Sequence, residues 1–587
     1  MRGEDQMRRE LLTRVTISLF VWTALAGGAQ EGPPDDYLFS EVIDVRLVNV
    51  EVWVTDAKGT PVSGLSAADF EILEDGRPVE ISYFAEIRES VPVAPTPAVD
   101  AREVPPAPQI AVPPDPSHLV VYFDELHLSP AGRRRAIKDL SNFLVDRKVP
   151  SERVLILSQD RDLRTEATFG STWGELDATL ERVAKALPRG GGREAQKRLA
   201  IRNLQDTWKW AREVAASRPG SDAGEAICDL FVPRAVPEVE IYAAESRERI
   251  AVTLDHLGST AAFLTGVPGV KTLIYVSDAL ERAPGTDLIK FVSDLCPVNT
   301  NTPMFLLSDE LSQEFRRLTR HANANRVTIY SLQASGLAGN FLIGAEQAGL
   351  ESPGILGSFD VALRMSEREG LSTLAAETGG RTIFNTNNFE DDFRQIALEM
   401  SSYYSLAYEP PHRGDEREHE IEVRVKSKNL RARHRRGYRD KNPDVRMTER
   451  LQGAVYLGLV DNPLDVRLGA GTVSGGAKGG MIFPLHILLP ADKIVFLPQD
   501  EGVVAQLSVQ VSTRNTQDQK GIFDHRAYRI NWKTASDQEL VSLAVDLEVP
   551  PGVHLVAVGV RDDATRETSF VSTTVEVHGV APASGAG

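Results

Sequence analysis

The sequence has few of the patterns that usually indicate an enzyme or a metal centre. Its eleven histidines include no His-Glu-x-x-His helix and no cysteine–histidine spacing suited to zinc. No Gly-x-Ser-x-Gly turn is present, and no serine or cysteine has an identifiable base partner in the sequence. Catalytic groups can assemble from distant positions, so these absences argue only weakly against catalysis. They leave no catalytic residue to predict.

The chain also lacks an excess of basic residues. It carries 83 acidic against 65 basic side chains, which gives a formal net charge of −18. Such a surface repels phosphate backbones, so nucleic acid is not an expected partner. The composition, 42% apolar and 25% charged, is ordinary for a soluble protein. A chain of 587 residues should form roughly three to four domains.

Long apolar runs are absent after the amino-terminal segment. An apolar stretch at residues 15–26 follows Arg8, Arg9 and Arg14, and the small residues Gly27 and Ala29 come after it. That stretch is shorter than the roughly 20 residues that a membrane-spanning helix needs. Residues 1–29 therefore resemble a secretory signal cleaved before Gln30, with an uncleaved anchor as the alternative. We expect an exported protein, periplasmic, on the outer surface or extracellular, with no transmembrane segment beyond this signal.

Cysteine is scarce, with only Cys228 and Cys296 in the whole chain. In an oxidising compartment two cysteines often pair. The sequence cannot place them within bonding distance, so a disulfide and two separate buried thiols both remain open.

Residues 30–90 predict a small β module of its own. Apolar and polar residues alternate in "VNVEVWV", and turn dipeptides follow at Lys58-Gly59 and Asp75-Gly76. Period-two alternation interrupted by such turns is typical of antiparallel strands. Residues 91–117 are crowded with proline, which favours an extended linker.

Residues 118–440 alternate short apolar runs with helical patterns. Apolar residues recur at helical spacing after the first two runs, at residues 136–144 and 176–187. Buried strands separated by helices imply parallel pairing, because a parallel connection needs a long crossover. The prediction is an α/β domain with a doubly wound, mostly parallel sheet. Its expected strands are residues 119–123, 153–158, 271–277 and 326–332.

Two further regions flank or interrupt this domain. Residues 190–265 form a long helical insert that we expect to pack on the rim of the sheet. Beyond residue 445 the helical signal disappears and period-two alternation returns, for example in "VSLAVDLEV". Residues 441–587 are therefore predicted to form a β-sandwich domain with a short tail.

Several stretches carry a family resemblance. They are "GLSAADFEILEDGRPVEISYF", "VVYFDELHLS", "GVKTLIYVSDAL", "TRHANANRVTIYSLQASGL", the succession from "LAAETGGR" to "YYSLAYEP", and "IEVRVKSKNLRARHRRGY". Together they make residues 40–440 similar to bacterial, acidobacterial-type proteins related to von Willebrand factor type A domains. The resemblance implies the same doubly wound sheet that the periodicity indicates.

That resemblance also implies a divalent ion above the carboxyl ends of the strands. The family uses an Asp-x-Ser-x-Ser turn, a threonine and a third-loop aspartate as oxygen ligands, and a partner's carboxylate completes the shell. Here Asp124 matches the first aspartate and Asp278 the last. Leu126 and Leu128 occupy the serine positions, and Arg193 and Glu194 stand near the expected threonine. The sequence therefore keeps the two aspartates of the family's metal site but not its hydroxyl ligands.

Other hydroxyls and carboxylates could replace the missing ligands. A weak site for Mg²⁺ or another divalent cation would use Asp124, Ser129 and Asp278. A partner-binding surface would include the two aspartates together with Glu125, Ser129 and Ser277. The alternative is that Asp124 and Asp278 only cap helices and hydrogen-bond the loops. A haloacid dehalogenase-type nucleophile is disfavoured, because Leu126 occupies the place of its second aspartate.

Two other motifs favour structural roles. The glycine-rich stretch at residues 469–480 lacks the glycine-lysine-Ser/Thr order of a phosphate loop and predicts a surface loop. The basic run at residues 431–439 predicts a solvated edge strand.

The combined prediction is an exported, non-enzymatic binding protein of the adhesion type. Its partner would be a protein or another component of the cell envelope, recognised by the loops at Asp124, Ser129 and Asp278. Two alternatives remain: a hydrolase with its site between the α/β domain and the helical insert, and a scaffold of the cell envelope.

Overall fold

The computed structural model describes fifteen segments of the chain. They are residues 47–88, 91–93, 117–145, 149–186, 191–217, 223–267, 269–297, 310–336, 353–412, 414–458, 461–476, 480–499, 502–517, 521–533 and 539–578. The expected signal segment, most of the proline linker, part of the glycine-rich loop and the tail lie outside these residues. Within the described residues, none of the helices combines the length and apolar character needed to cross a membrane.

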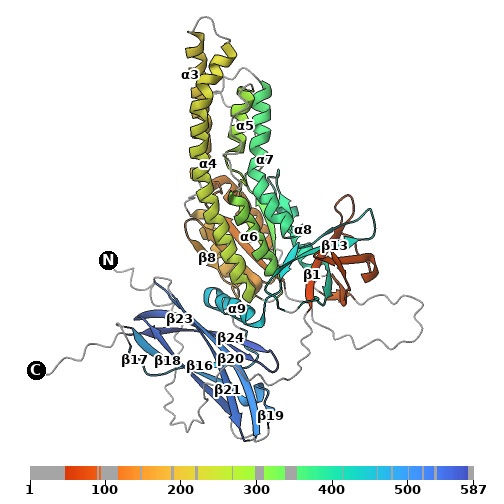
Figure 1. Cartoon of the computed structure of the whole chain (residues 1–587), viewed down its shortest axis with the longest axis vertical. Helices are drawn as coiled ribbons and strands as arrows, with labels where there is room; N and C mark the ends of the chain where they lie inside the picture. Colours follow the sequence, from red (N-terminus) through yellow and green to blue (C-terminus); the bar gives the residue numbers. More distant parts are fainter. Residues whose placement is uncertain are drawn as a thin grey trace, which may run out of the picture.

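A six-stranded, mostly parallel sheet forms the centre of the molecule, which confirms the expected mixed α/β class (Figure 1). The strand order is β11-β10-β9-β6-β7-β8, and only β8 runs antiparallel to its neighbour. The four predicted strands are confirmed as β6, β7, β9 and β10. The six strands are β6 (Ser117–Asp124), β7 (Val154–Gln159), β8 (Leu163–Ala167), β9 (Val270–Ser277), β10 (Val327–Gln333) and β11 (Thr382–Ile383).

Helices cover both faces of this sheet because its strands are apolar on both sides. Leu119, Val121 and Phe123 of β6 share one core with helices α1 (Pro130–Val145), α2 (Trp173–Lys185) and α8 (Glu390–Ser401). Val120 and Tyr122 share the other core with α4 (Ala223–Phe263), α6 (Glu310–Ala324) and α7 (Pro353–Glu377). Alternate residues of one strand thus pack into the cores on opposite faces of the sheet.

The helical insert does more than line the rim of the sheet. The carboxyl half of α4 packs on the sheet through Ile250, Leu254 and Leu257. Its amino half pairs with α3 (Gly191–Ala216), and this pair projects from the sheet with α5 (Thr286–Leu295) and part of α7 alongside (Figure 1). We call these four helices the helical extension.

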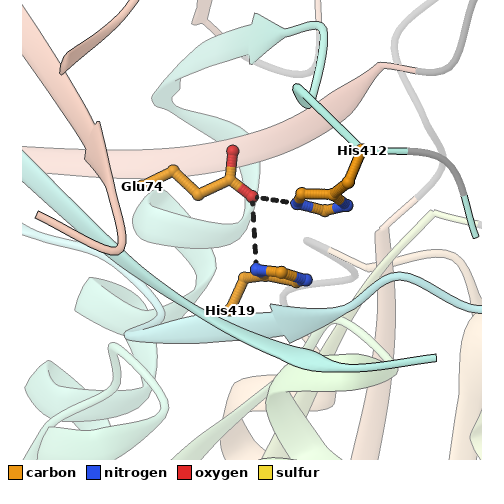
Figure 2. Close-up of side chains that lie close together, drawn as sticks. All are labelled: Glu74, His412 and His419. Carbon is orange, nitrogen blue, oxygen red and sulfur yellow. Dashed lines mark hydrogen bonds and ion pairs between the residues drawn. The ribbon is translucent and has the colours of Figure 1, made fainter. Parts of the chain in front are cut away.

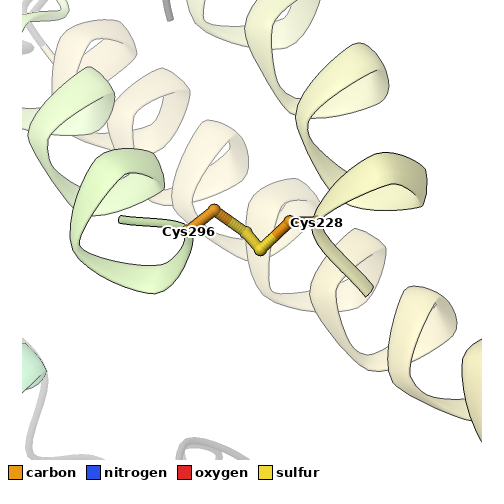
Figure 3. Close-up of a disulfide and its surroundings, with 2 residues drawn as sticks. All are labelled: Cys228 and Cys296. Carbon is orange, nitrogen blue, oxygen red and sulfur yellow. A yellow bond between two sulfur atoms is a disulfide. The ribbon is translucent and has the colours of Figure 1, made fainter. Parts of the chain in front are cut away.

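A disulfide closes the helical extension. Cys228 in α4 bonds Cys296 at the carboxyl end of α5, across 68 residues of sequence (Figure 3). The bond lies in an apolar core that includes Phe231, Phe291 and Phe359. Of the two possibilities left open by the sequence, the structure has the disulfide.

The N-terminal strands do not form a module by themselves. Strand β1 pairs with β12 and β14, β12 lies between β1 and β4, and β2 pairs with β13. The two resulting sheets, β14-β1-β12-β4-β5 and β15-β13-β2-β3, share one apolar core, and we call them together the β unit. Its strands are β1 (Val48–Thr55), β2 (Phe70–Glu74), β3 (Arg77–Val79), β4 (Tyr83–Arg88), β5 (Val91–Val93), β12 (Tyr403–Tyr408), β13 (Glu418–Val425), β14 (Arg431–Arg433) and β15 (Gly437–Arg439).

This arrangement changes the expected domain boundaries. Residues 403–439, assigned from the sequence to the α/β domain, complete the β unit instead. The basic run at residues 431–439 supplies β14 and β15, which lie at the ends of their sheets. The edge position predicted for that run is confirmed.

The carboxyl-terminal region begins with a helix that the alternating pattern of its sequence did not predict. Helix α9 (Pro443–Leu457) starts at the N-cap Asn442, whose side chain accepts a hydrogen bond from the Val445 amide, and ends at Gly458 with φ 65°. Asparagine, proline and glycine at these places are standard helix-boundary signals. These boundary signals place a helix here, before the strand-like alternation begins. Leu451 and Ala454 pack the helix against Phe570.

Two antiparallel sheets follow α9 and share a large apolar core. Alternate residues of β18 and β22 point into this core, as the period-two pattern predicts. The strands are β16 (Arg467–Ala470), β17 (Ser474–Gly475), β18 (Met481–Pro490), β22 (Leu540–Val549) in one sheet and β19 (Leu497–Gln499), β20 (Gly502–Asn515), β21 (Gly521–Trp532), β23 (Gly552–Asp562), β24 (Thr568–Val577) in the other. Short 3₁₀ turns lie at Ala67–Asp69, Ser151–Arg153, Leu264–Gly266 and Ala491–Lys493.

We predict that Gly380→Ala lowers the free energy of unfolding by roughly 1–3 kcal/mol, the usual cost of overpacking. A Cβ at Gly380 would lie 1.9 Å from the carbonyl oxygen of Ile329 in β10, so the backbone must move. Gly174→Ala is the control, because a Cβ there meets nothing within 4 Å and alanine favours the helix. Urea unfolding checks both variants, and equal stability of the two would contradict the steric argument.

Candidate functional site

The carboxyl edge of the parallel sheet brings the five predicted site residues together. Strand β6 lies where the sheet order reverses, between β7 and β9, and open α/β sheets bind ligands at that point. Asp124 ends β6 and Ser277 ends β9, with Asp278 directly after it. Glu125 and Ser129 follow Asp124 in the loop before α1. Parallel pairing therefore places these residues as the sequence predicted.

Asp124 is fully buried and surrounded by donors from its own chain. Its Oδ2 accepts hydrogen bonds from the Tyr275 hydroxyl at 2.5 Å and the Ser277 hydroxyl at 3.2 Å, and it contacts His127 Nδ1 at 2.8 Å. Its Oδ1 accepts from the backbone amides of Leu126 at 3.2 Å and His127 at 3.3 Å. Both oxygens thus hold the β6–α1 loop in place.

Asp278 is also turned inward, with 4% of its surface exposed. Its Oδ2 accepts a hydrogen bond from the Ser129 amide at 2.7 Å, and Ser129 Oγ accepts one from the Gly132 amide at 3.1 Å. The two side chains therefore satisfy the amino end of α1. Burial raises the pKa of Asp278, against the effects of Ser129 and Arg193. Its Oδ1 is buried without a hydrogen-bond partner among the described residues.

Glu125 and Ser277 have internal partners too. Glu125 forms an ion pair with Arg133 at 3.0 Å, and burial raises its pKa although Arg133 opposes that change. Ser277 is fully buried and its hydroxyl lies 2.9 Å from the Ala279 carbonyl oxygen. Of the five predicted residues, only Ser129 is partly exposed. The expectation that these side chains themselves contact a partner needs correction, because four of them are buried.

The residues at this edge do not fit a magnesium ion. Mg²⁺ requires about six oxygen ligands in a near-octahedral shell. Asp124 offers no free oxygen, Leu126 and Leu128 offer none at all, and Asp278 Oδ1 is a single unpaired acceptor. The positive charge of Arg193 also acts on this carboxyl group, since it opposes the rise that burial causes in the pKa of Asp278.

Arg193 belongs to a largely buried cluster of charged groups, four of whose five residues lie in helices of the helical extension. Its Nη1 lies 3.2 Å from Glu367 Oε1 and 3.9 Å from Glu281 Oε1. Lys197, one turn further along α3, lies 2.6 Å from Asp287 Oδ2 and 3.2 Å from Glu281 Oε1. We call these five residues the α3 charge cluster. It fixes α3 to the loops and helices that follow β9 and to α7.

Burial and the two cations shift the pKa values of the three carboxyl groups in the α3 charge cluster. Burial raises the pKa of Asp287 and of Glu367. Burial also acts to raise the pKa of Glu281, but Lys197 and Arg193 more than offset it, so that pKa is lowered. Both cations lie near Glu281, at 3.2 Å for Lys197 and 3.9 Å for Arg193.

Metal-ligating side chains also gather outside this edge. Glu74, His412 and His419 of the β unit place ligand atoms within 4.8 Å of one another. No sequence pattern indicates this group, because Glu74 precedes the α/β domain in the chain and the two histidines follow it. Only the knowledge that β2 pairs with β13 would have joined them.

Comparison with known proteins adds no relative. No protein-family model matches the chain, and no curated protein matches it either.

Proposed function

We propose that this is an exported, non-enzymatic protein-binding protein built on a von Willebrand factor type A-like domain with a carboxyl-terminal β-sandwich. A parallel sheet with helices on both faces, and two aspartates at its carboxyl edge, support the resemblance seen in the sequence. Two antiparallel sheets around one core support the sandwich. In this proposal the partner is a protein or another component of the cell envelope.

Recognition in this proposal does not require a metal ion. The carboxylates at the positions that hold the ion in the resembled family accept hydrogen bonds here from hydroxyls and backbone amides. Four of the five predicted site residues are buried, and α3 is joined to the segment after β9 by the α3 charge cluster. The proposal therefore places the contact surface on the helical extension and not on the edge of the sheet.

The observation that carries the proposal is an apolar row on α7. Val361 and Met365 lie one turn apart and are 52% and 68% exposed. Arg368 continues the same side of the helix and stacks over the ring of Phe384, 4.7 Å from its centroid, and Phe384 is 45% exposed. We call these four residues the α7 strip. Large apolar side chains clustered in water are typical of protein-binding surfaces, where aromatic residues, methionine and arginine are enriched.

A pull-down from envelope extract tests the proposal with Val361→Asp/Met365→Asp as the variant. Two charges on an apolar contact should weaken binding at least about tenfold, since each core contact contributes on the order of 1 kcal/mol or more. Phe523→Asp is the matched control, because Phe523 is 50% exposed on β21, far along the chain in another domain. We expect the same partner with wild type and control, with or without Mg²⁺, and its loss with the α7 variant. Equal recovery by all three proteins would contradict the proposal.

The hydrolase alternative has a definite location to test. A groove between α4 and α6 is lined by Asp255, Ser259, Glu314 and His321, among others. Burial lowers the pKa of His321, which favours its neutral form. We expect no turnover of esterase, phosphatase or peptidase substrates. Turnover that disappears in His321→Gln would overturn the binding proposal in favour of an enzyme.

A further inference from the structure

A histidine–carboxylate cluster lies in the β unit, away from the sheet edge described above. Glu74 ends β2, His419 lies in β13, and His412 lies in the loop between β12 and β13 (Figure 2). Glu74 Oε1 is 2.7 Å from His412 Nε2 and 3.7 Å from His419 Nδ1. Glu74 and His419 are buried, and His412 is partly exposed. One nitrogen of each ring therefore converges on the same carboxylate.

The second nitrogen of each ring also meets a carboxylate. His412 Nδ1 lies 3.2 Å from Asp440 Oδ2, and His419 Nε2 lies 3.2 Å from Asp415 Oδ1. Metal-binding histidines usually have this arrangement, in which an outer carboxylate orients the ring and strengthens the ligand nitrogen. Two such pairs flank one inner carboxylate, that of Glu74.

The inner carboxylate keeps an unused oxygen. Glu74 Oε1 accepts a hydrogen bond from the Tyr438 hydroxyl at 2.7 Å, but Glu74 Oε2 is buried and has no hydrogen-bond partner among the described residues. A buried acceptor without a partner costs free energy unless something binds it. Asp75 adds another carboxylate, 2.8 Å from His419 Nδ1. Four carboxylates thus surround two imidazoles, and a divalent cation would offset the excess negative charge.

We propose that Glu74, His412 and His419 bind a divalent transition-metal ion of the zinc class. Two imidazole nitrogens and a carboxylate suit Zn²⁺ and its neighbours, whereas Mg²⁺ and Ca²⁺ prefer oxygen ligands alone. The two rings now lie parallel, with centroids 3.7 Å apart. Coordination tilts the His412 ring so that both nitrogens point at one ion. His412 lies in a loop, so this tilt leaves the strand pairing intact.

The ion would join distant parts of the chain. It would tie the end of β2 to the loop and strand that follow β12, where the pairing of β2 with β13 already holds them. Because the ion binds only the folded β unit, it would raise the stability of the protein by mass action.

Calorimetry on the full chain with Zn²⁺ tests the proposal, and Mg²⁺ is the control ion. We expect one Zn²⁺ site, no Mg²⁺ binding at the same concentrations, and a higher Tm with Zn²⁺. Glu74→Gln and His412→Asn should each weaken Zn²⁺ binding at least about tenfold. His525→Asn is the matched control, since His525 is exposed on β21, and it should bind Zn²⁺ as the wild type does.

A milder variant keeps the test valid if an inner residue proves essential for folding. Asp415→Asn changes only an outer carboxylate that is 28% exposed in its side chain. It should fold, as circular dichroism would show, and bind Zn²⁺ about tenfold more weakly. With Co²⁺ in place of Zn²⁺, the wild type should show visible absorption bands of a nitrogen–oxygen site, and His412→Asn should lose them. Zn²⁺ affinity that is unchanged in Glu74→Gln, His412→Asn and Asp415→Asn would overturn the proposal.

Discussion

Replacing Lys197 with methionine is expected to lower the free energy of unfolding by about 3–5 kcal/mol, the usual cost of breaking a buried ion pair from one side. Lys197 is 1% exposed, and its ammonium lies 2.6 Å from Asp287 and 3.2 Å from Glu281. Methionine keeps most of the side-chain volume, so the loss is electrostatic. Two carboxyl groups then remain buried without their nearest cation.

The pH dependence separates this cause from simple repacking. Burial already raises the pKa of Asp287 above its ordinary value, and loss of Lys197 raises it further. A carboxyl group with a raised folded-state pKa destabilises the fold at pH values above its unfolded pKa and has no such effect below it. The deficit of the variant should therefore be large at pH 8 and should shrink as the pH falls toward about 4.

Urea unfolding at several pH values measures this effect, and Lys290→Met is the matched control. Lys290 pairs with Asp294 at 2.8 Å on the same extension, but its side chain is 51% exposed. Exposed pairs contribute about 0–1 kcal/mol, so the control should change little. A loss that is equal in both variants, or independent of pH, would show that the α3 charge cluster is not what holds α3 in place.

Removing the disulfide with Cys228→Ala/Cys296→Ala is expected to cost about 4 kcal/mol. The estimate comes from the closure entropy of a loop of this length, in which 68 residues of sequence separate the two cysteines. Alanine is preferred to serine here because Cys228 and Cys296 are 8% and 2% exposed, and a hydroxyl would be buried.

Thermal unfolding with and without a thiol reductant measures the contribution of the bond. The wild type should lose stability when it is reduced, and the double variant should match the reduced wild type and ignore the reductant. The helical extension should also become more sensitive to protease than the rest of the chain, since the bond ties α4 to α5. Identical midpoints for oxidised wild type and double variant would contradict the prediction.

The sequence predicted best those elements whose structure depends on residues close by in the chain. Short apolar runs identified β6, β7, β9 and β10, because strands buried on both faces need apolar residues at every position. Parallel pairing then placed Asp124 and Asp278 at one edge. The pattern alone could not show that the hydroxyls of Tyr275 and Ser277, from the adjacent strand, would donate hydrogen bonds to Asp124.

Contacts between residues far apart in the chain could not be predicted from the sequence. The alternation in β1 shows that it is a strand, but nothing local shows that β12 and β14 are its partners. The same limit hid the cluster of Glu74, His412 and His419, and it hid the α3 charge cluster, in which Lys197 meets Glu281 and Asp287. The missed helix α9 is different, since Asn442, Pro443 and Gly458 mark its ends in the sequence itself.

The β unit is built from segments that precede and follow the central sheet in the chain, and this has a consequence for folding during synthesis. Strand β12 lies between β1 and β4 in the sheet. Synthesis starts at the amino end, so β1 and β4 are made long before β12, because β4 ends at Arg88 and β12 begins at Tyr403. Until then β1 has exposed edges and no permanent neighbour. Those edges are a hazard for aggregation during this interval. Folding of the β unit is therefore completed only when residues from beyond the central sheet have been synthesised.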